Sequence, residues 1–418
     1  MLFMLTIKSL KNRKLTVCLT LFMLISSVVL LLSVDRIRID TRNSFANTIS
    51  GTDLIIGART SDINLLLYSV FRMGNATNNI GWDSYQEIIK QPQIKWSIPI
   101  SLGDSHQGYK VIGTDNNYFK HFQYAQKNNL EFLEGEQFKH VFSVVLGSEV
   151  AQKLGYQLGD LISIAHGAGT TSFTNHDDKP FTVTGILKPT GTPVDQSLHV
   201  PLEGISAIHI DWSNGSKKSG LSISAQQALE MDLTPNSITS ALIGLNSKMA
   251  IFSFQRDINE YPKEPLSAII PATALAKLWQ LIKAGESALF AVSIMVLITS
   301  LIAMTTVILS GLNERKREIA VLRAIGLPAK KILTLLICES TFYGVISIGI
   351  GYVIHVFSIL LTQNWLQTHY GIQLHWMMPS NFMLITLTGF LLMSVLLGFI
   401  PGLKAYFNTL SDGLNPKI

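Results

Sequence analysis

Residues 287–313, with the sequence SALFAVSIMVLITSLIAMTTVILSGLN, contain no charged side chain. A helix crosses the hydrocarbon core of a bilayer with about 20 apolar residues, so this stretch predicts a transmembrane helix. Runs of nearly the same character lie at residues 15–34, 332–361 and 380–400. The whole chain is 47% hydrophobic and only 15% charged, whereas soluble proteins average roughly a quarter charged residues. We therefore predict an integral membrane protein, which excludes soluble cytoplasmic enzymes, nucleic-acid modules and disordered scaffolds.

The charged residues near the ends of these runs predict the topology. Basic residues precede the first run and fill the loop between the second and third, at Lys8, Lys11, Arg13, Lys14, Arg315, Lys316, Arg317, Arg323, Lys330 and Lys331. Residues 35–286 carry 21 Lys and Arg against 24 Asp and Glu. Because basic residues near span ends mark the cytoplasmic side, we expect both termini inside and the large block outside.

A cleaved signal peptide is the alternative interpretation of the first run. The run is about 20 residues long, which exceeds the usual core of a signal peptide, and no small-residue cleavage site follows it before Asp35. We therefore interpret it as an uncleaved anchor.

The block between the first two spans alternates short β-type runs with turn residues. Its candidate strands are residues 53–56, 143–146, 160–164 and 181–187, and residues 148–154 read as a short helix with Ser148 as its N-cap and Gly155 as its stop. Strands interleaved with short helices predict an α+β domain. A second lobe is expected at about residues 206–265, in series with the first. Both cysteines, Cys18 and Cys338, lie in apolar runs, so no disulfide is expected in this block.

Two helical segments of the outer block have two interpretations each. Residues 271–285 place four apolar side chains on one helical face, Leu275, Leu278, Leu281 and Ile282. This face predicts a stalk that runs into the second span or a helix lying on the membrane. Residues 65–71 are apolar but too short to cross a bilayer. They read either as a segment at the outer membrane surface or as a core helix.

Residues 314–328, with the sequence ERKREIAVLRAIGLP, predict a short amphipathic helix. Glu314 and Glu318 stand at its start, where the helix dipole favours acids, and Val321, Leu322 and Ile325 form an apolar stripe. Gly326 and Pro328 predict its end. A basic loop that only sets the topology is the alternative, but it leaves the stripe unexplained.

The sequence ERKREIAVLRAIG at residues 314–326 resembles the signature of the FtsX/MacB/LolC-type ABC transporter permeases. Residues 145–162 and 181–187 resemble the MacB-type periplasmic core domain, and IPGLKA at residues 400–405 is similar to the family's Pro-x-x-x-Ala. The order of one span, a large outer domain and three spans also matches the family.

This resemblance implies a fold class of four transmembrane helices with a large α+β extracytoplasmic domain between the first and second. The corresponding boundaries are a cytoplasmic N-terminus at 1–14, spans at 15–34, 286–311, 332–361 and 380–401, the periplasmic domain at 35–270, a stalk at 271–285, a coupling-helix loop at 312–331, a short periplasmic loop at 362–379 and a cytoplasmic tail at 402–418.

The resemblance also implies a function. In this family the helix after the second span couples the permease to an ATPase, which assigns ATPase coupling to Glu314, Arg315, Arg317, Glu318, Leu322, Arg323, Ala324 and Gly326. The chain is then a non-catalytic subunit in the bacterial inner membrane. It would work with two copies of a separate ABC ATPase, with a second permease copy, identical or different, and with a periplasmic binding or adaptor protein where the system uses one.

Two features depart from the family pattern. The tail after Ala405 lacks an Arg-rich run with Pro, so contacts through the tail are not expected. The ATPase fused to MacB is also missing, because the sequence contains no G-x-x-x-x-G-K-[S/T] loop for nucleotide phosphates. We expect no cofactor in this chain, with ATP and magnesium bound by the partner ATPase.

Two other function classes stay open. One is a regulator like FtsX, which moves no substrate and activates a periplasmic partner. The weaker one is a component of a metal-related system, for example for zinc, which rests on His166, His176, Asp177 and Asp178 in one polar loop. None of these residues has the spacing of a ligand pair on one helix or hairpin, so we predict a solvated loop and no metal site.

The third span contains one acid, Glu339. A carboxylate inside a membrane is costly enough to suggest function, and we expect a structural or coupling role rather than contact with substrate. Gly344, Ser347, Gly349 and Gly351 of the same span form a face of small residues. We expect this face to allow close helix packing, the alternative being that these residues only loosen a long helix.

Overall fold

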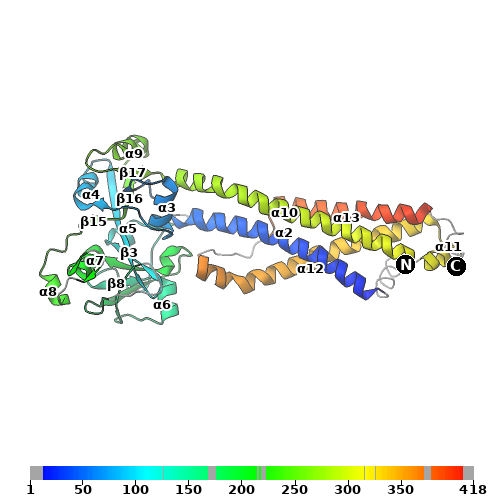
Figure 1. Cartoon of the computed structure of the whole chain (residues 1–418), viewed down its shortest axis with the longest axis horizontal. Helices are drawn as coiled ribbons and strands as arrows, with labels where there is room; N and C mark the ends of the chain where they lie inside the picture. Colours follow the sequence, from blue (N-terminus) through cyan, green and yellow to red (C-terminus); the bar gives the residue numbers. More distant parts are fainter. Residues whose placement is uncertain are drawn as a thin grey trace. The chain divides into compact units, whose positions relative to one another are not determined.

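A computed structural model describes residues 13–125, 127–167, 176–213, 216–217, 223–314, 316–324, 326–370 and 378–407. The chain divides into two compact units. Residues 1–41 and 283–418 form the first, here called the helical unit, and residues 42–282 form the second, here called the α/β domain. Figure 1 colours both units along the sequence, from blue near the N-terminus to red near the C-terminus.

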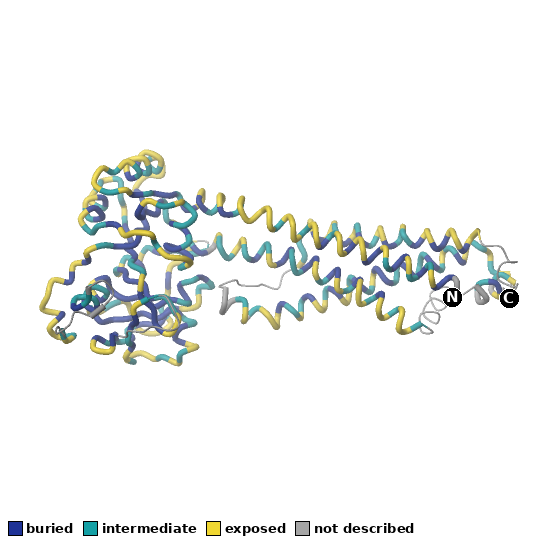
Figure 2. Tube along the Cα trace, viewed as in Figure 1, coloured by how far each residue is buried: buried dark blue, intermediate teal, exposed yellow. Residues whose placement is uncertain are grey.

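Four long apolar helices and one short helix make up the described part of the helical unit. Their bounds are α2 (Lys14–Thr48), α10 (Pro271–Glu314), α11 (Lys316–Ala324), α12 (Ala329–Tyr370) and α13 (Asn381–Phe407). The four long helices each contain a stretch that is long and apolar enough to span a membrane. Apolar side chains from all of them meet in a shared core, while their outward faces stay exposed (Figure 2), as expected for surfaces that contact lipid.

The helices extend beyond the spans that hydropathy predicts. α2 continues to Thr48, and α12 continues to Tyr370, so the predicted short loop at 362–379 begins as helix. α13 passes through Pro401 and ends at Phe407. Hydropathy locates the part of a helix that lies in lipid, but a polar sequence without a breaker continues as helix beyond it. Residues 371–377 and most of the predicted tail, 408–418, lie outside the described residues.

α10 begins at Pro271 and runs as one helix to Glu314. The segment predicted as a stalk is therefore the start of the helix that also contains the second span. Its first turns belong to the α/β domain, where Ala274 and Leu275 join an apolar core. Leu281 is 68% exposed, so only the beginning of the predicted apolar face is covered within the described residues.

A mixed sheet forms the centre of the α/β domain. Among the described residues it has 11 strands, of which nine follow the order β17-β1-β16-β3-β4-β12-β8-β11-β7, while β10 pairs with β3 and β9 with β11. The strands of this sheet are β1 (Leu54–Ala58), β3 (Ile94–His106), β4 (Tyr109–Thr114), β7 (Phe132–Gly135), β8 (Ser143–Leu146), β9 (Leu161–Ile162), β10 (Ala165–His166), β11 (Phe181–Leu187), β12 (Ser197–Pro201), β16 (Ser240–Leu245) and β17 (Leu266–Ile269). The β4–β12 and β8–β11 pairs are parallel, whereas the other pairs are antiparallel.

Short elements surround this sheet, and the remaining described strands pair into three small sheets, β13–β14, β15–β2 and β5–β6. The remaining strands are β2 (Ile80–Gly81), β5 (Gln123–Tyr124), β6 (Asn128–Asn129), β13 (Trp212–Ser213), β14 (Ser216–Lys217) and β15 (Ser237–Ile238). The helices are α3 (Asp62–Val70), α4 (Trp82–Ile89), α5 (Asn117–His121), α6 (Ser148–Leu154), η1 (Pro193–Gln196), α7 (Leu202–His209), α8 (Ala225–Leu229), η2 (Lys248–Ala250) and α9 (Ile251–Asn259).

The central strands are buried on both faces. In β1, Ile55 points into one apolar core and its neighbours Leu54 and Ile56 point into another. Successive side chains of a strand alternate between faces, so an unbroken apolar run is required where both faces are covered. α3 covers one of these faces with Leu65 and Leu66, both fully buried. Of the two interpretations of residues 65–71, the core helix is therefore the correct one.

The two lobes are not arranged in series as predicted. β16 lies between β1 and β3, so residues 240–245 complete the lobe that begins at β1. α7 and α8 instead pack in the apolar core next to β8 and β11. The residues predicted as a second lobe, 206–265, are thus divided between the part of the sheet around β1 and the part around β8 and β11. The reason is that β16, which comes late in the sequence, pairs with β1 near the start of the domain.

The N-cap of α6 is Gly147 and not Ser148 as predicted. No side chain caps the helix there, while Gly155 ends it in the left-handed conformation, with φ of 72°. A Cβ on Gly147 would lie 2.2 Å from the carbonyl oxygen of Val194. Close backbone approach, rather than capping, therefore explains the glycine in the Leu146–Gly147–Ser148 sequence.

The buried His199 predicts how the stability of the α/β domain depends on pH. The side chain lies on β12 with no exposed surface, and its ring centroid is 4.8 Å from that of Tyr118. Burial, with the nearby Arg72 cation as a smaller cause, lowers the pKa of His199 to about 3. An unfolded chain takes up this proton near pH 6.5 and the folded chain does not, so stability is lost as the pH falls from 6.5 toward 3, by about 1.4 kcal/mol per pH unit.

The variant His199→Phe should therefore lose less stability than the parent chain over this pH range. The measurement is the thermal unfolding of the purified full-length chain, followed by circular dichroism at several pH values. His140→Phe is the matched control, because His140 is exposed. Equal pH dependence in the His199 variant and the parent chain would contradict the assignment.

Candidate functional site

α11 contains five of the predicted coupling residues, Arg317, Glu318, Leu322, Arg323 and Ala324, whereas Glu314, predicted at the start of this helix, is the last residue of α10. α11 spans Lys316–Ala324, between α10 and α12. Ile319 is partly buried and Ala320 is 4% exposed, with Ile319 packed against the core of the helical unit. Gly326 has a φ of 96°, and its N–H donates to the carbonyl oxygen of Arg323. This left-handed glycine ends the helix where the sequence predicts.

The opposite side of α11 is open to solvent. Val321 is 52% exposed, Ala324 is also exposed, and Arg323 is half-buried. Of the predicted apolar stripe, Val321 is thus exposed, and the side of α11 that packs on the unit is formed instead by Ile319 and Ala320, which the stripe did not include. Arg315 and Ile325 lie outside the described residues, and so do the side chains of Glu314, Arg317, Glu318 and Leu322.

Glu339 lies in α12 and is 5% exposed. Its carboxylate is therefore shielded by the surrounding helices. A structural or coupling role for Glu339 stays a prediction.

Small residues let α12 and α13 approach closely. A Cβ on Gly344 would lie 2.5 Å from Ser394 Oγ, and one on Gly398 would lie 2.0 Å from Ser340 Oγ. A Cβ on Gly351 would meet Val28 of α2 at 2.8 Å. The predicted packing face is thus confirmed at Gly344 and Gly351, but not at Gly349, where a Cβ would have no heavy atom of the described neighbouring residues within 4 Å.

The structure adds a polar layer that the sequence analysis did not single out. In α2, Arg36 binds Asp40 through two hydrogen bonds of 2.6 and 2.7 Å, and both residues are buried. The hydroxyl of Ser380 donates to Asp35 at 3.0 Å, and Ser33 contacts His355 Nδ1 at 3.1 Å. These contacts connect α2 to α12 and to the start of α13. The spacing of Arg36 and Asp40, four residues apart on one helix face, was the available signal.

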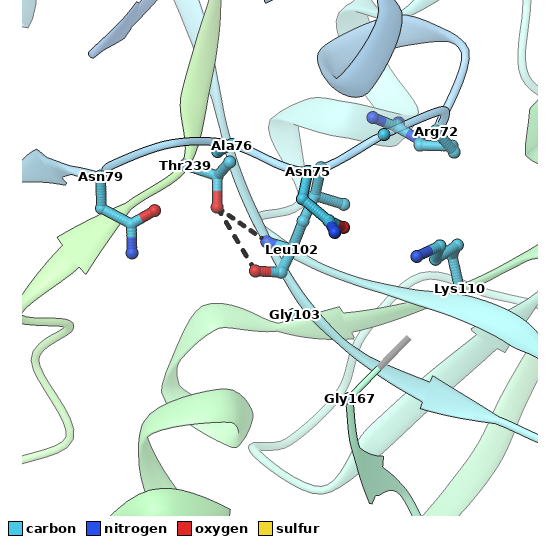
Figure 3. Close-up of a pocket in the computed structure, with 10 residues that line it drawn as sticks. Arg72, Asn75, Ala76, Asn79, Leu102, Gly103, Lys110, Gly167 and Thr239 are labelled. Carbon is cyan, nitrogen blue, oxygen red and sulfur yellow. Dashed lines mark hydrogen bonds between the residues drawn. The ribbon is translucent and has the colours of Figure 1, made fainter. Parts of the chain in front are cut away.

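Two neighbouring cavities of the α/β domain have charged side chains in their walls. One has a volume of about 310 Å³ and is lined by Arg72 and Lys110 with Asn75 (Figure 3). Thr239 borders it and binds the backbone of Leu102. Burial lowers the pKa of both Arg72 and Lys110. Two cationic side chains in one cavity favour an anionic group.

The second cavity has a volume of about 450 Å³ and shares Asn79, Leu102 and Gly103 with the first. Its wall includes Asp104, His166, His209 and Trp212. The ring nitrogens of His166, His176 and His209 lie within 4.8 Å of one another. The prediction of a solvated loop is wrong for His176, which is 1% exposed. His209 and Asp104 were missed because they lie far from His166 and His176 in sequence.

The fold and these features define a class of protein. Four apolar helices, a short helix between the second and third, and an α/β domain between the first and second are the architecture of a multi-pass membrane permease with an extracytoplasmic domain. Two family models match the chain. The MacB-like periplasmic core domain matches residues 17–241, and the FtsX-like permease C-terminal domain matches residues 290–410. The chain belongs to the FtsX/MacB-type ABC transporter permease family, as its resemblance predicts.

Among the solved structures with detectable similarity are a periplasmic and an extracellular domain. The periplasmic region of MacB from Actinobacillus actinomycetemcomitans is 14% identical, covers 55% of this chain and 94% of its own, and has a TM-score of 0.34. The extracellular domain of the noncanonic ABC-type transporter YknZ from Gram-positive bacteria is 13% identical and has a TM-score of 0.30. The match covers 52% of this chain and 99% of the YknZ domain. No curated protein matches the chain.

Proposed function

We propose that this chain is the permease subunit of a mechanotransmission-type ABC transporter. A separate ABC ATPase, present in two copies, binds ATP and magnesium and docks on α11. Hydrolysis then moves the extracytoplasmic domain, which exports or extracts a substrate on the periplasmic side. The chain itself transmits the movement and performs no catalysis. The family membership implies an ABC ATPase partner.

The observation that carries this proposal is the two-sided character of α11. Ile319 and Ala320 anchor the helix to the helical unit, while Val321 and Ala324 offer apolar surface beside Arg323. Exposed apolar residues next to a cation are suited to contact a partner. α10 and α12 flank α11 in sequence, so a movement of α11 is passed to the spans on either side.

We further propose that the permease lies in the bacterial inner membrane with both termini in the cytoplasm. Its functional form contains a second permease copy, identical or different, and a periplasmic binding or adaptor protein where the system uses one. The basic residues of the loop that contains α11 support this orientation.

Charge introduced on the open side of α11 should break the coupling. We expect Val321→Glu and Ala324→Glu to lower the amount of ATPase that copurifies with the full-length chain at least about tenfold, since burying an unpaired carboxylate at an interface costs more than 1.4 kcal/mol. ATPase stimulation by the permease in nanodiscs should fall in parallel.

The matched control is Met249→Glu, which places the same charge on a residue of the α/β domain that is 92% exposed. This variant should bind and stimulate the ATPase like the parent chain. If the α11 variants also retain binding and stimulation, α11 is not the docking site.

A further inference from the structure

Asp104 and three histidines converge at one edge of the central sheet. Asp104 lies on β3 directly opposite His166 on β10, since these two residues are partners in the strand register. His209 is the last residue of α7. His176 is held by its backbone, whose N–H donates to the carbonyl oxygen of Ile164. Four separate segments of the chain thus bring potential metal ligands together.

The distances among three of these ligand atoms fit one coordination face. His166 Nδ1 is 3.1 Å from His209 Nε2 and 3.2 Å from Asp104 Oδ1. His209 Nε2 is 3.4 Å from the same carboxylate oxygen. Tetrahedral zinc with bonds of about 2.0–2.1 Å separates its ligands by about 3.3 Å. The three atoms therefore form a triangle of the size that such an ion requires.

The tautomer of His209 leaves its Nε2 atom free to coordinate a metal ion. Its Nδ1 lies 2.9 Å from the carbonyl oxygen of Ile205, which only accepts hydrogen bonds, so Nδ1 carries the proton. In the neutral ring Nε2 then has a lone pair, and this lone pair faces Asp104 and His166. A histidine whose other nitrogen donates to a backbone carbonyl is the usual arrangement of a metal ligand.

His176 supplies an independent observation. Both of its ring nitrogens are buried and find no hydrogen-bond partner among the described residues, and an unsatisfied buried polar group is costly. Its ring packs against Trp212, with centroids 4.7 Å apart. Its ring nitrogens are therefore available to an ion that enters the cluster.

A buried ion pair fixes the segments on which His176 and Trp212 lie. Lys179 Nζ is 3.0 Å from Asp211 Oδ1, and neither side chain has exposed surface. The backbone N–H of Lys179 also donates a hydrogen bond to the carbonyl oxygen of His176. This support restricts where the His176 ring can lie.

We propose that the α/β domain binds one divalent transition-metal ion of the zinc class through His166, His209 and Asp104, with His176 as the fourth ligand. Imidazole nitrogens with one carboxylate oxygen suit zinc and the neighbouring divalent ions, rather than magnesium or calcium. The cluster opens into the cavity of about 450 Å³, and the His166 side chain is 40% exposed, so an ion can enter from solvent. The proposal does not depend on coupling to an ATPase.

The test uses the full-length chain in detergent, with an affinity tag that contains no histidine. The protein is stripped with a chelator and titrated with Zn²⁺ in competition with a chromophoric chelator. We expect one bound ion per chain. Co²⁺ in place of Zn²⁺ should give the intense visible absorption bands of a tetrahedral site. Zn²⁺ should also raise the melting temperature, because it binds the folded state.

His166→Ala and His209→Ala should each weaken Zn²⁺ binding by more than the roughly 10–100-fold that loss of an outer partner costs. Asp104→Asn should weaken it as well, and His140→Ala, at an exposed site, should leave it unchanged. Circular dichroism verifies that the variants fold. Zn²⁺ binding that survives in both histidine variants, or a stripped parent chain that takes up no Zn²⁺, overturns the proposal.

Discussion

Replacing Asp211 by alanine should destabilise the α/β domain by about 3 kcal/mol. The Lys179–Asp211 pair is fully buried, so the variant leaves the Lys179 ammonium without its main counter-charge. Asp178 still approaches Lys179 at 3.2 Å, which places the effect at the lower end of the range for broken buried pairs. For a domain of this size the melting temperature should fall by roughly 6–12 °C.

Two further variants separate the burial of charge from loss of packing. Asp178→Ala should cost at most about 1 kcal/mol, because Asp178 is 31% exposed. The double variant Lys179→Met with Asp211→Leu should recover much of the loss, since an apolar pair replaces a buried ion pair at little cost. If Asp211→Ala and Asp178→Ala have equal effects, the buried pair does not hold this part of the domain.

Replacing Asp40 by alanine should destabilise the helical unit by about 3–5 kcal/mol. Arg36 makes both of its described hydrogen bonds to Asp40, and its side chain is only 9% exposed. The variant leaves a guanidinium buried among helices without that partner. The measurement is the melting temperature of the full-length chain in detergent, by size exclusion with fluorescence detection after heating.

Arg38→Ala is the control for the Asp40 variant. Arg38 pairs with Asp35 at 2.8 Å on the same helix, but its side chain is 37% exposed. Solvent screens this pair, so its loss should cost less than about 1 kcal/mol. A melting temperature that falls equally in both variants would show that burial of Arg36 is not the cause.

The membrane architecture was predictable because each span has its own signal in the sequence. An apolar run of this length can lie only in a membrane or in the centre of a large core. The ends of the helices were less predictable. α2 and α12 continue through polar residues to Thr48 and Tyr370, since hydropathy measures contact with lipid and not the helical state.

Local strands of the α/β domain were also predictable, while their arrangement was not. The runs at β8 and β11 are apolar and β-branched, and the structure has strands at the predicted residues. Insertion of β16 between β1 and β3 depends on pairing between residues far apart in the chain. No local pattern encodes such pairing, which explains the incorrect order of the lobes.

The histidine cluster was also unpredictable from local sequence patterns. A search for ligand pairs on one helix or hairpin finds nothing, because His176 and His209 meet only through the fold. His166 and Asp104 are brought together by the pairing of β10 with β3. Short-range spacing detects sites that are built on one element and misses sites that a sheet assembles.

The pairing of β1 with β17 has a consequence for protein engineering. Ile55, near the start of β1, stands opposite Ile269 at the end of β17, so the polypeptide enters and leaves this domain at neighbouring points. Domains with adjacent ends tolerate transplantation and circular permutation. We therefore expect a short glycine–serine linker to join the two ends of the domain just outside these strands, and the same junction offers a place to exchange this domain for that of a relative.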